Sequence, residues 1–315
     1  MLAFNTDWLG ESQNIYEIED CLKAIADAGF SHVHWCHNWD GEYTYSVMEM
    51  LQIRGWMKKY NLKMKGIHAT EGHHRTNVLG KYKYRWEREN RRDYTSENEF
   101  NRIAGVELIK NRVDMAYLLD TSEIVLHMQL PYRAFEEDPS FRDRYYAQVC
   151  KSFDELEFYC KTRGVRLCVE NLLGTPNEHQ IYQFDLLFDR YDSDFLGYCC
   201  DTGHALVTSK TDCLELPKRY VDRMFFIHTS DNIGLQSPDC WEDDIKMTHC
   251  DQHRLPFEGK YDWDGFAKLV AQSPYEYPIV LEVSSNDPTD TGYLARARET
   301  GERLRKLVED YRGAL

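Results

Sequence analysis

The chain has 315 residues, of which 42% are hydrophobic and 13% aromatic, and its formal net charge is −15. This length and apolar content allow one large α/β domain with a sizeable core and exclude a predominantly disordered chain. The acidic balance argues against a nucleic-acid-binding protein, because a negatively charged surface repels the phosphate backbone.

Short apolar runs alternate with longer amphipathic segments along the whole sequence. The apolar runs predict eight strands, over residues 1–5, 30–36, 62–69, 124–130, 165–170, 196–201, 224–228 and 278–283. The segments between and after them have apolar residues at helical spacing and predict helices over 15–28, 45–60, 97–119, 141–163, 181–190, 214–220, 263–271 and 291–311. Strict alternation implies parallel strands with right-handed crossovers, and eight such units close most economically into a (β/α)8 barrel. We therefore expect a single barrel domain over residues 1–315.

The chain exceeds the ~250 residues typical of such a barrel, and the excess falls in two long loops. One follows the third predicted strand (residues 70–96) and the other follows the seventh (residues 229–261). Within the first, residues 71–95 carry seven Lys and Arg against four Asp and Glu, with aromatic residues between them. The favoured interpretation is a lid or subunit contact, and the alternative is an arm that holds an anionic or sugar-like substrate.

The cysteines and the N-terminus bear on the location of the protein. Ten cysteines occur without a CxxC pair, which indicates reduced, mostly buried thiols. The first residues lack the features of a signal peptide, and no apolar run reaches the roughly 18 residues of a membrane helix. We therefore expect a cytoplasmic protein that does not enter a membrane.

Side chains that bind metals lie at or just beyond the ends of the predicted strands. They are His68, His127, Glu170, Asp201, His204, His228 and Glu282, joined by Asp251 and His253 from the second long loop. In a barrel all strand ends open on one mouth, so these residues converge. Carboxylates with imidazoles suit Mn, Mg, Co or Zn. Three carboxylates within about 5 Å repel one another by a few kcal/mol per pair at an effective dielectric of about 20, and a divalent cation removes that cost.

Each of these residues also has a structural interpretation when it is considered alone. His127 in an apolar strand is more often a hydrogen-bonded core histidine, and Asp201 with the turn after it fits a helix N-cap. His32 and His34, which alternate with Val33, are interpreted as structural. Four apolar runs that each end on a ligand-type side chain are hard to obtain by chance, and this favours the metal site.

The segments around these residues resemble the xylose isomerase-like barrel superfamily, which includes sugar isomerases and epimerases, inosose dehydratases and endonuclease IV-type enzymes. The segments are VEN at Glu170, DTGH at Asp201, IHTSDN at His228, DQHRLPFEGKYDW at Asp251 and LEVS at Glu282. The resemblance implies one divalent ion, Mn²⁺ before Co²⁺, Mg²⁺ or Zn²⁺, bound by Glu170, Asp201, His228 and Glu282.

The same resemblance implies a sugar isomerase or epimerase that removes a proton next to a carbonyl through a metal-stabilised enediolate. Glu170 and Glu282 would act as a base and acid pair on opposite faces of a ketose. The expected substrate contacts are His68, His127, His204, His253 and Arg254.

Two other activities stay open for the same residues. The first is an elimination lyase on a 3-keto sugar conjugate, similar to the α-subunits of C-glycoside deglycosidases. It starts with the same enolisation, suits an aromatic-rich mouth and implies a small second subunit. The second is an endonuclease IV-type nuclease with three zinc ions, whose extra ligands have matches in His68, His127, His204, Asp251 and His253.

The net charge of −15 weighs against the nuclease, and two candidate bases have little use in a barrel that only binds a ligand. The expected partners are a small carbohydrate and further copies of the chain in a homo-oligomer, with no nucleic acid and no membrane.

Overall fold

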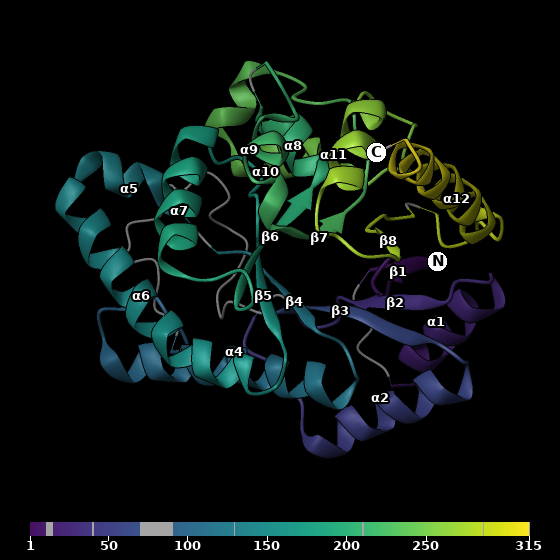
Figure 1. Ribbon diagram of the computed structural model, residues 1–315, viewed down its shortest axis with the longest axis horizontal. Coiled ribbons are helices and arrows are strands. Elements are labelled where there is room, and N and C mark those ends of the chain that lie inside the picture. Colours follow the sequence, from purple (N-terminus) through teal and green to yellow (C-terminus); the bar gives the residue numbers. More distant parts are fainter. Residues whose placement is uncertain are drawn as a thin grey trace.

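Eight parallel strands lie side by side around a central axis, and helices cover their outer surface (Figure 1). This computed structural model describes residues 1–10, 15–39, 41–69, 91–128, 130–209, 211–285 and 287–314. The strands are β1 (Leu2–Asn5), β2 (His32–Trp35), β3 (Lys63–Ala69), β4 (Glu123–Leu126), β5 (Arg166–Glu170), β6 (Leu196–Asp201), β7 (Met224–His228) and β8 (Ile279–Leu281).

The strand order is β7-β6-β5-β4-β3-β2-β1-β8, so the first strand pairs with the last. Just beyond β7, the Thr229 amide donates to the Val280 carbonyl (3.0 Å) and the Glu282 amide donates to the Thr229 carbonyl (3.2 Å). These bonds connect the two ends of the sheet. The predicted (β/α)8 barrel is therefore confirmed.

The long helices lie where the apolar spacing predicted them. They are α1 (Ile15–Asp27), α2 (Val47–Lys59), α4 (Glu99–Leu118), α6 (Pro139–Lys161), α7 (Asn177–Arg190), α11 (Trp263–Gln272) and α12 (Tyr293–Arg312). Local signals fix their starts: the Ser46 side chain accepts from the Glu49 amide at the start of α2, and the Glu49 carboxylate accepts from the Ser46 amide. The predicted helix 214–220 is shorter, α9 (Glu215–Arg219), and continues as a 3₁₀ turn, η2 (Val221–Arg223).

Four short elements were not predicted, because one or two turns carry too little periodicity. They are α5 (Tyr132–Glu137), α8 (Thr202–Thr208), η3 (Pro238–Glu242) and α10 (Asp244–Cys250). The last two lie in the long loop after β7. Most of the basic and aromatic insert, residues 71–90, lies outside the described residues.

Three predicted strands are each three residues longer than the observed strands β2, β4 and β8, and the reason is burial without pairing. The apolar run 124–130 continues past β4 because Met128 and Leu130 are buried in the following loop. Likewise Val283 is buried beyond β8, and β2 is also shorter than the predicted strand 30–36. As a result, His127 and Glu282 each lie one residue after a strand, where the chain enters the barrel mouth.

The barrel interior is built in layers, because side chains two residues apart on a strand point to the same side. One fully buried apolar layer consists of Ala3, Val125, Cys168, Cys199, Phe226 and Val280. Two residues further along five of these segments come His127, Glu170, Asp201, His228 and Glu282. The candidate ligands therefore lie together on an apolar floor.

The cysteines are mostly buried thiols, as the sequence predicted. All ten cysteines are free thiols and seven of them are buried, including Cys168 and Cys199 in the apolar layer. Across the described ranges, no helix combines the length and the apolarity needed to cross a membrane.

Candidate metal centre and active site

Four ligand-type side chains from β5, β6, β7 and the end of β8 meet at the barrel mouth. The His228 Nδ1 atom lies 3.0 Å from Glu282 Oε2, 3.2 Å from Glu170 Oε1 and 3.9 Å from Asp201 Oδ2. One ligand atom of each residue lies within 4.8 Å of the corresponding atoms of the other three. The structure thus brings together the four predicted metal ligands.

The unsatisfied polar atoms of this group fit a divalent cation. Glu170, Asp201 and His228 are fully buried. Within the described part of the chain, neither Glu170 oxygen, nor Asp201 Oδ2, nor His228 Nδ1 has a hydrogen-bond partner. Buried polar atoms without partners are rare because they cost free energy. Three of these atoms, Glu170 Oε1, Asp201 Oδ2 and His228 Nδ1, lie together beside Glu282 Oε2, and such a donor set suits Mn, Co, Mg or Zn.

The charges around Glu170 explain why a bound cation would be favourable at this point. Burial opposes ionisation of Glu170, but the adjacent imidazoles of His127 and His228 outweigh burial and hold its pKa well below the usual value. For Asp201, burial raises the pKa to about 7, and the Glu170 carboxylate adds to the rise while His204 opposes it. The acids therefore compete for positive charge, which a bound cation would supply.

Asp201 is held in place by the first turn of α8. Its Oδ1 atom accepts a hydrogen bond from the His204 amide (2.6 Å), so Asp201 is the N-cap that the sequence suggested. Asn171 fixes the backbone on the other side, because its Oδ1 accepts from the Asp201 amide (2.9 Å) and its Nδ2 donates to the Asp201 carbonyl (2.9 Å). Both interpretations of Asp201 hold together: Oδ1 caps the helix and Oδ2 stays free for a ligand role.

A second group lies on the other side of Glu170. Glu170 Oε2 is 3.0 Å from His127 Nε2 and 3.7 Å from His68 Nε2. Trp39 covers both imidazoles, with ring centroids 4.5 Å from His68 and 5.1 Å from His127. Ligand atoms of His68, His127 and Glu170 also lie within 4.8 Å of one another.

A third group forms around Asp251 in the loop after β7. Asp251 Oδ2 lies 3.3 Å from His204 Nε2 and 2.9 Å from His253 Nε2. Burial opposes the imidazolium form, yet Asp251 raises the pKa of His253 to about 10. The Arg254 backbone is fixed by two hydrogen bonds to the Asp231 backbone (2.9 Å each), and its side chain stays a predicted substrate contact.

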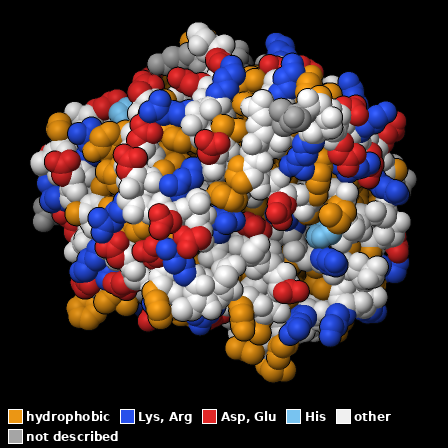
Figure 2. All heavy atoms as spheres, in the orientation of Figure 1, with side chains coloured by type: hydrophobic (Ala, Val, Ile, Leu, Met, Phe, Trp, Pro, Cys, Tyr) orange, Lys and Arg blue, Asp and Glu red, His pale blue; other side chains and the backbone are white. Residues whose placement is uncertain are grey.

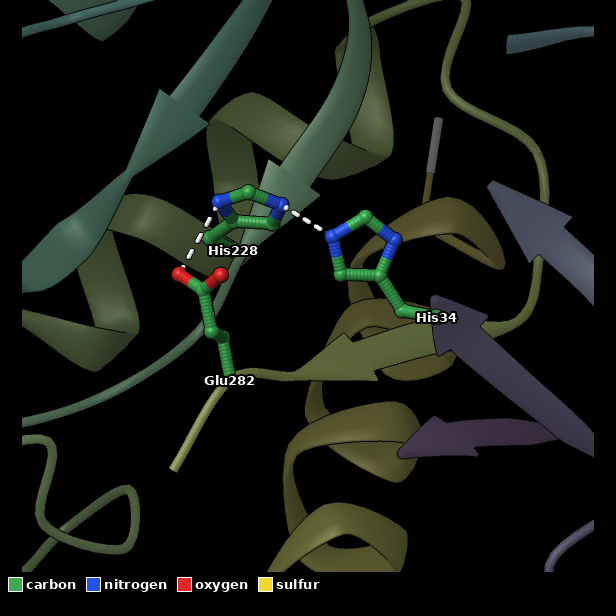
Figure 3. Close-up of side chains that lie close together, drawn as sticks. All are labelled: His34, His228 and Glu282. Carbon is green, nitrogen blue, oxygen red and sulfur yellow. Dashed lines mark hydrogen bonds and ion pairs between the residues drawn. The ribbon is translucent and has the colours of Figure 1, made fainter. Parts of the chain in front are cut away.

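Two residues in and beside the site received no functional role from the sequence. His34 was interpreted as structural, but its Nε2 atom lies 2.9 Å from His228 Nε2 (Figure 3). Burial lowers the pKa of His34 to about 3, and His228 adds to this effect. Asp231 anchors the loop that carries Asp251 and His253. The signal for Asp231 is the SDN sequence just after the His228 strand, and no local signal separates His34 from His32.

Comparisons with known proteins agree with this architecture. Residues 22–307 match the family model described as a xylose isomerase-like TIM barrel. The chain belongs to that family. The uncharacterized protein y4fM of Sinorhizobium fredii is 29% identical over 303 residues, which cover 94% of this chain and 91% of that protein.

Several proteins that are similar to this chain carry named activities. An inosose dehydratase of Yersinia enterocolitica is 30% identical over 196 residues, which span 57% of this chain and only 59% of that enzyme. Among solved structures, a D-tagatose 3-epimerase-like protein has a TM-score of 0.67 at 16% identity and covers 98% of this chain and 99% of its own. An L-ribulose 3-epimerase has a TM-score of 0.63 at 15% identity, covering 98% and 96%. At these identities the structural likeness shows the shared fold.

Proposed function

We propose that the chain is a divalent-metal-dependent carbohydrate isomerase or epimerase. The observation that carries the proposal is that ligand atoms of two glutamates, one aspartate and one histidine meet at the barrel mouth. Within the described part of the chain, those of Glu170, Asp201 and His228 are buried and have no hydrogen-bond partner. The epimerase and inosose dehydratase relatives support a carbohydrate substrate. Mn²⁺ is proposed as the ion, and a cytoplasmic homo-oligomer as the state of the protein.

The two glutamates are the proposed acid and base. The Glu282 side chain is 12% exposed at the mouth, whereas Glu170 is fully enclosed by imidazoles. Burial opposes ionisation of Glu282, but His228 holds its pKa below the usual value, so it is an ionised proton acceptor at neutral pH. Glu282 therefore removes the proton next to the substrate carbonyl. Glu170, which is ionised at rest, would take up a proton from the adjacent His204 imidazolium, whose Nδ1 lies 3.3 Å from Glu170 Oε1, and return it to the substrate from the other side.

The proposed metal ligands are Glu170, Asp201, His228 and Glu282. A divalent ion in that position would stabilise the negative charge that develops on the substrate oxygens. His204 and His253 lie beside Asp251 on the loop side of the mouth, and Arg254 follows His253 in the same loop. His68 and His127 lie on the other side of Glu170, beside Trp39. These residues are proposed to hold the sugar hydroxyls and to orient the carbon that loses its proton.

The test is solvent deuterium exchange into a panel of ketoses and 3-keto glycosides with Mn²⁺, Co²⁺ or Mg²⁺ added. Glu170→Gln and Glu282→Gln should each slow the exchange by at least about 100-fold, the usual contribution of a positioned acid or base. Glu123→Gln is the matched control, since Glu123 pairs with Lys65 and Arg166 at the start of β4, far from the mouth. Exchange that survives both changes would exclude the assigned roles.

An elimination lyase begins with the same proton removal, and the inosose dehydratase relatives favour keeping this candidate. Product analysis separates the two activities. An isomerase or epimerase returns a sugar of the same mass, whereas a lyase releases water or an aglycone. Release of an aglycone only when a second small subunit is added would favour a deglycosidase-like enzyme.

One specific observation favours a second candidate, a multinuclear hydrolase of the endonuclease IV type. His68, His204 and His253 each direct Nδ1 at a backbone carbonyl, of Ala69, Asn171 and Glu282 respectively. In their neutral forms each therefore presents an Nε2 lone pair to a carboxylate oxygen, of Glu170 or Asp251. Lone pairs that face each other need a proton or further cations between them.

Metal analysis distinguishes these candidates, with about one ion per chain for the sugar enzyme and up to three for the hydrolase. On the face shown in Figure 2, acidic and basic side chains are interspersed, which offers little for phosphate-backbone binding. Cleavage of a duplex with an abasic site at physiological salt would replace the carbohydrate proposal with the nuclease.

A further inference from the structure

His34 lies behind the candidate metal ligand His228 and touches it through a ring nitrogen. It is fully buried on β2. Its Nδ1 atom lies 3.1 Å from the Gly66 carbonyl oxygen on β3, and its Nε2 atom lies 2.9 Å from His228 Nε2 (Figure 3). On its other side, His228 directs Nδ1 at the carboxylates of Glu170 and Glu282.

This chain of contacts determines which nitrogens carry hydrogen. A carbonyl oxygen only accepts hydrogen bonds, so His34 Nδ1 must carry the hydrogen that it shares with Gly66. In a neutral His34 ring, Nε2 then has only a lone pair, and His228 Nε2 must donate to it. A neutral His228 consequently has its lone pair on Nδ1, the atom that faces the three carboxylates.

The strands hold this arrangement rigidly. The pairing of β2 with β3 shifts register between Val33 and His34, which sets His34 opposite Gly66. Gly66 has room only for hydrogen, because a Cβ atom there would lie 2.5 Å from the Phe226 ring. The same Phe226 ring packs against His34, with centroids 5.2 Å apart. The backbone acceptor and the imidazole are therefore fixed relative to each other.

We infer that His34 is a positioning residue that holds His228 in the Nε2–H form and keeps Nδ1 available for a divalent cation. The inference rests on the metal site proposed above. Histidine ligands usually donate their second N–H to a carboxylate, carbonyl or water. Here a neutral imidazole takes that place, which orients His228 without adding a fourth acid beside Glu170, Asp201 and Glu282.

Three substitutions at His34 distinguish the loss of the Nε2 hydrogen-bond acceptor from the loss of ring packing. His34→Phe keeps a ring but removes the acceptor, and His34→Asn can reach the Gly66 carbonyl but not His228. His34→Gln restores an acceptor oxygen close to the position of Nε2. His32→Phe is the matched control on the same strand, since the His32 ring contacts Ser31 rather than the site.

The measurement is Mn²⁺ affinity without sugar, by calorimetry or competition with a chelator. His34→Phe and His34→Asn should bind Mn²⁺ about 10- to 100-fold more weakly, as is usual when such a partner is lost. His34→Gln and His32→Phe should stay close to the original chain. Equal losses in His34→Phe and His34→Gln would indicate packing and overturn the proposal, as would unchanged affinity in all variants or no divalent binding by the original chain.

A second measurement needs no variant and decides the question if the substitutions prevent folding. In the Zn²⁺-loaded protein labelled with ¹⁵N-histidine, long-range proton–nitrogen correlation should show His228 protonated on Nε2 only. A proton on Nδ1 would overturn the proposal. Because neither experiment contains a sugar, a failed carbohydrate assay with Mn²⁺ binding that depends on His34 would reject the proposed reaction and leave this inference standing.

Discussion

The buried carboxylate of Asp231 anchors the long loop that carries Asp251, His253 and Arg254 to the barrel. Its Oδ2 atom accepts from the Trp263 indole (2.8 Å) and the Gly259 amide (3.0 Å), and its Oδ1 atom accepts from the amides of Asn232 (2.9 Å) and Tyr261 (3.2 Å). Each oxygen thus accepts two hydrogen bonds. Three of the four donors belong to residues some 30 positions later in the chain, and the fourth is the amide of the next residue. We predict that Asp231→Asn strongly destabilises the protein.

The magnitude follows from the geometry of the four donors. In Asp231→Asn, an NH₂ group replaces one of the two oxygens, whichever way the amide is turned. The two N–H donors that bonded to that oxygen then lose their acceptor and face the NH₂ donor instead. No rotamer of Asn provides an acceptor for all four donors. A hydrogen bond to a charged group contributes about 1.5–3 kcal/mol, so the loss of two should lower the free energy of unfolding by about 3–6 kcal/mol. The space cannot relax easily, because a Cβ at Gly259 would already lie 2.1 Å from the Asn232 carbonyl oxygen.

Urea unfolding followed by fluorescence measures this change. Asp262→Asn is the control, because Asp262 is an exposed N-cap whose side chain accepts from the Gly265 amide (3.0 Å), and Asn caps equally well. The control should stay within about 0.5 kcal/mol of the original chain. If Asp231→Asn also stays within that range, the four hydrogen bonds do not stabilise the loop and the reasoning is wrong.

Three further predictions test charge, metal and capping. Burial lowers the pKa of His37 from 6.5 to about 4, so the unfolded chain takes up its proton first and stability falls as the pH drops from 6.5 to 4. That gap corresponds to about 3 kcal/mol, and His37→Leu should lack this part of the pH dependence in urea titrations. Adding Mn²⁺ at 100 times its Kd to chelator-treated protein should raise the free energy of unfolding by about 2.7 kcal/mol, and Glu170→Gln should lose this gain; equal gains in both proteins would exclude Glu170 as a ligand. Asp201→Asn should be at least as stable as the original chain in chelator, since Asn is an equivalent N-cap and the amide removes the cost of burying the carboxylate, but it should bind Mn²⁺ poorly in calorimetry.

The sequence was sufficient for the barrel and for the set of residues that meet at its mouth. Apolar runs in strict alternation with amphipathic segments predicted eight parallel strands in a barrel. Ligand-type residues two positions after Cys168, Cys199 and Phe226 continue the inward face of each strand. Side chains on a strand alternate between its two faces, so this regularity can be read from one strand without knowing which strands lie beside it.

What the sequence did not reveal depends on contacts between distant segments. His32 and His34 have the same local pattern, and only the register shift against β3 sets His34 behind His228. Similarly, Asp231 acts through Gly259 and Trp263, which are brought to it by the loop path. Short α8 and α10 follow from their N-caps, Asp201 and Asp243, rather than from periodicity.

Asp201 connects the folding of this chain to its proposed chemistry. Its Oδ1 atom caps α8 and thereby sets the path of the chain to His204, while its Oδ2 atom remains without a partner among the described residues. The burial of a carboxylate with one free oxygen raises its pKa to about 7, which is a cost of folding without a cation. Helix capping explains why an Asp, Asn, Ser or Thr stands at this position, but only the free oxygen requires the acid. The capping and metal-binding roles therefore belong to different atoms of one side chain, and an amide in its place separates them.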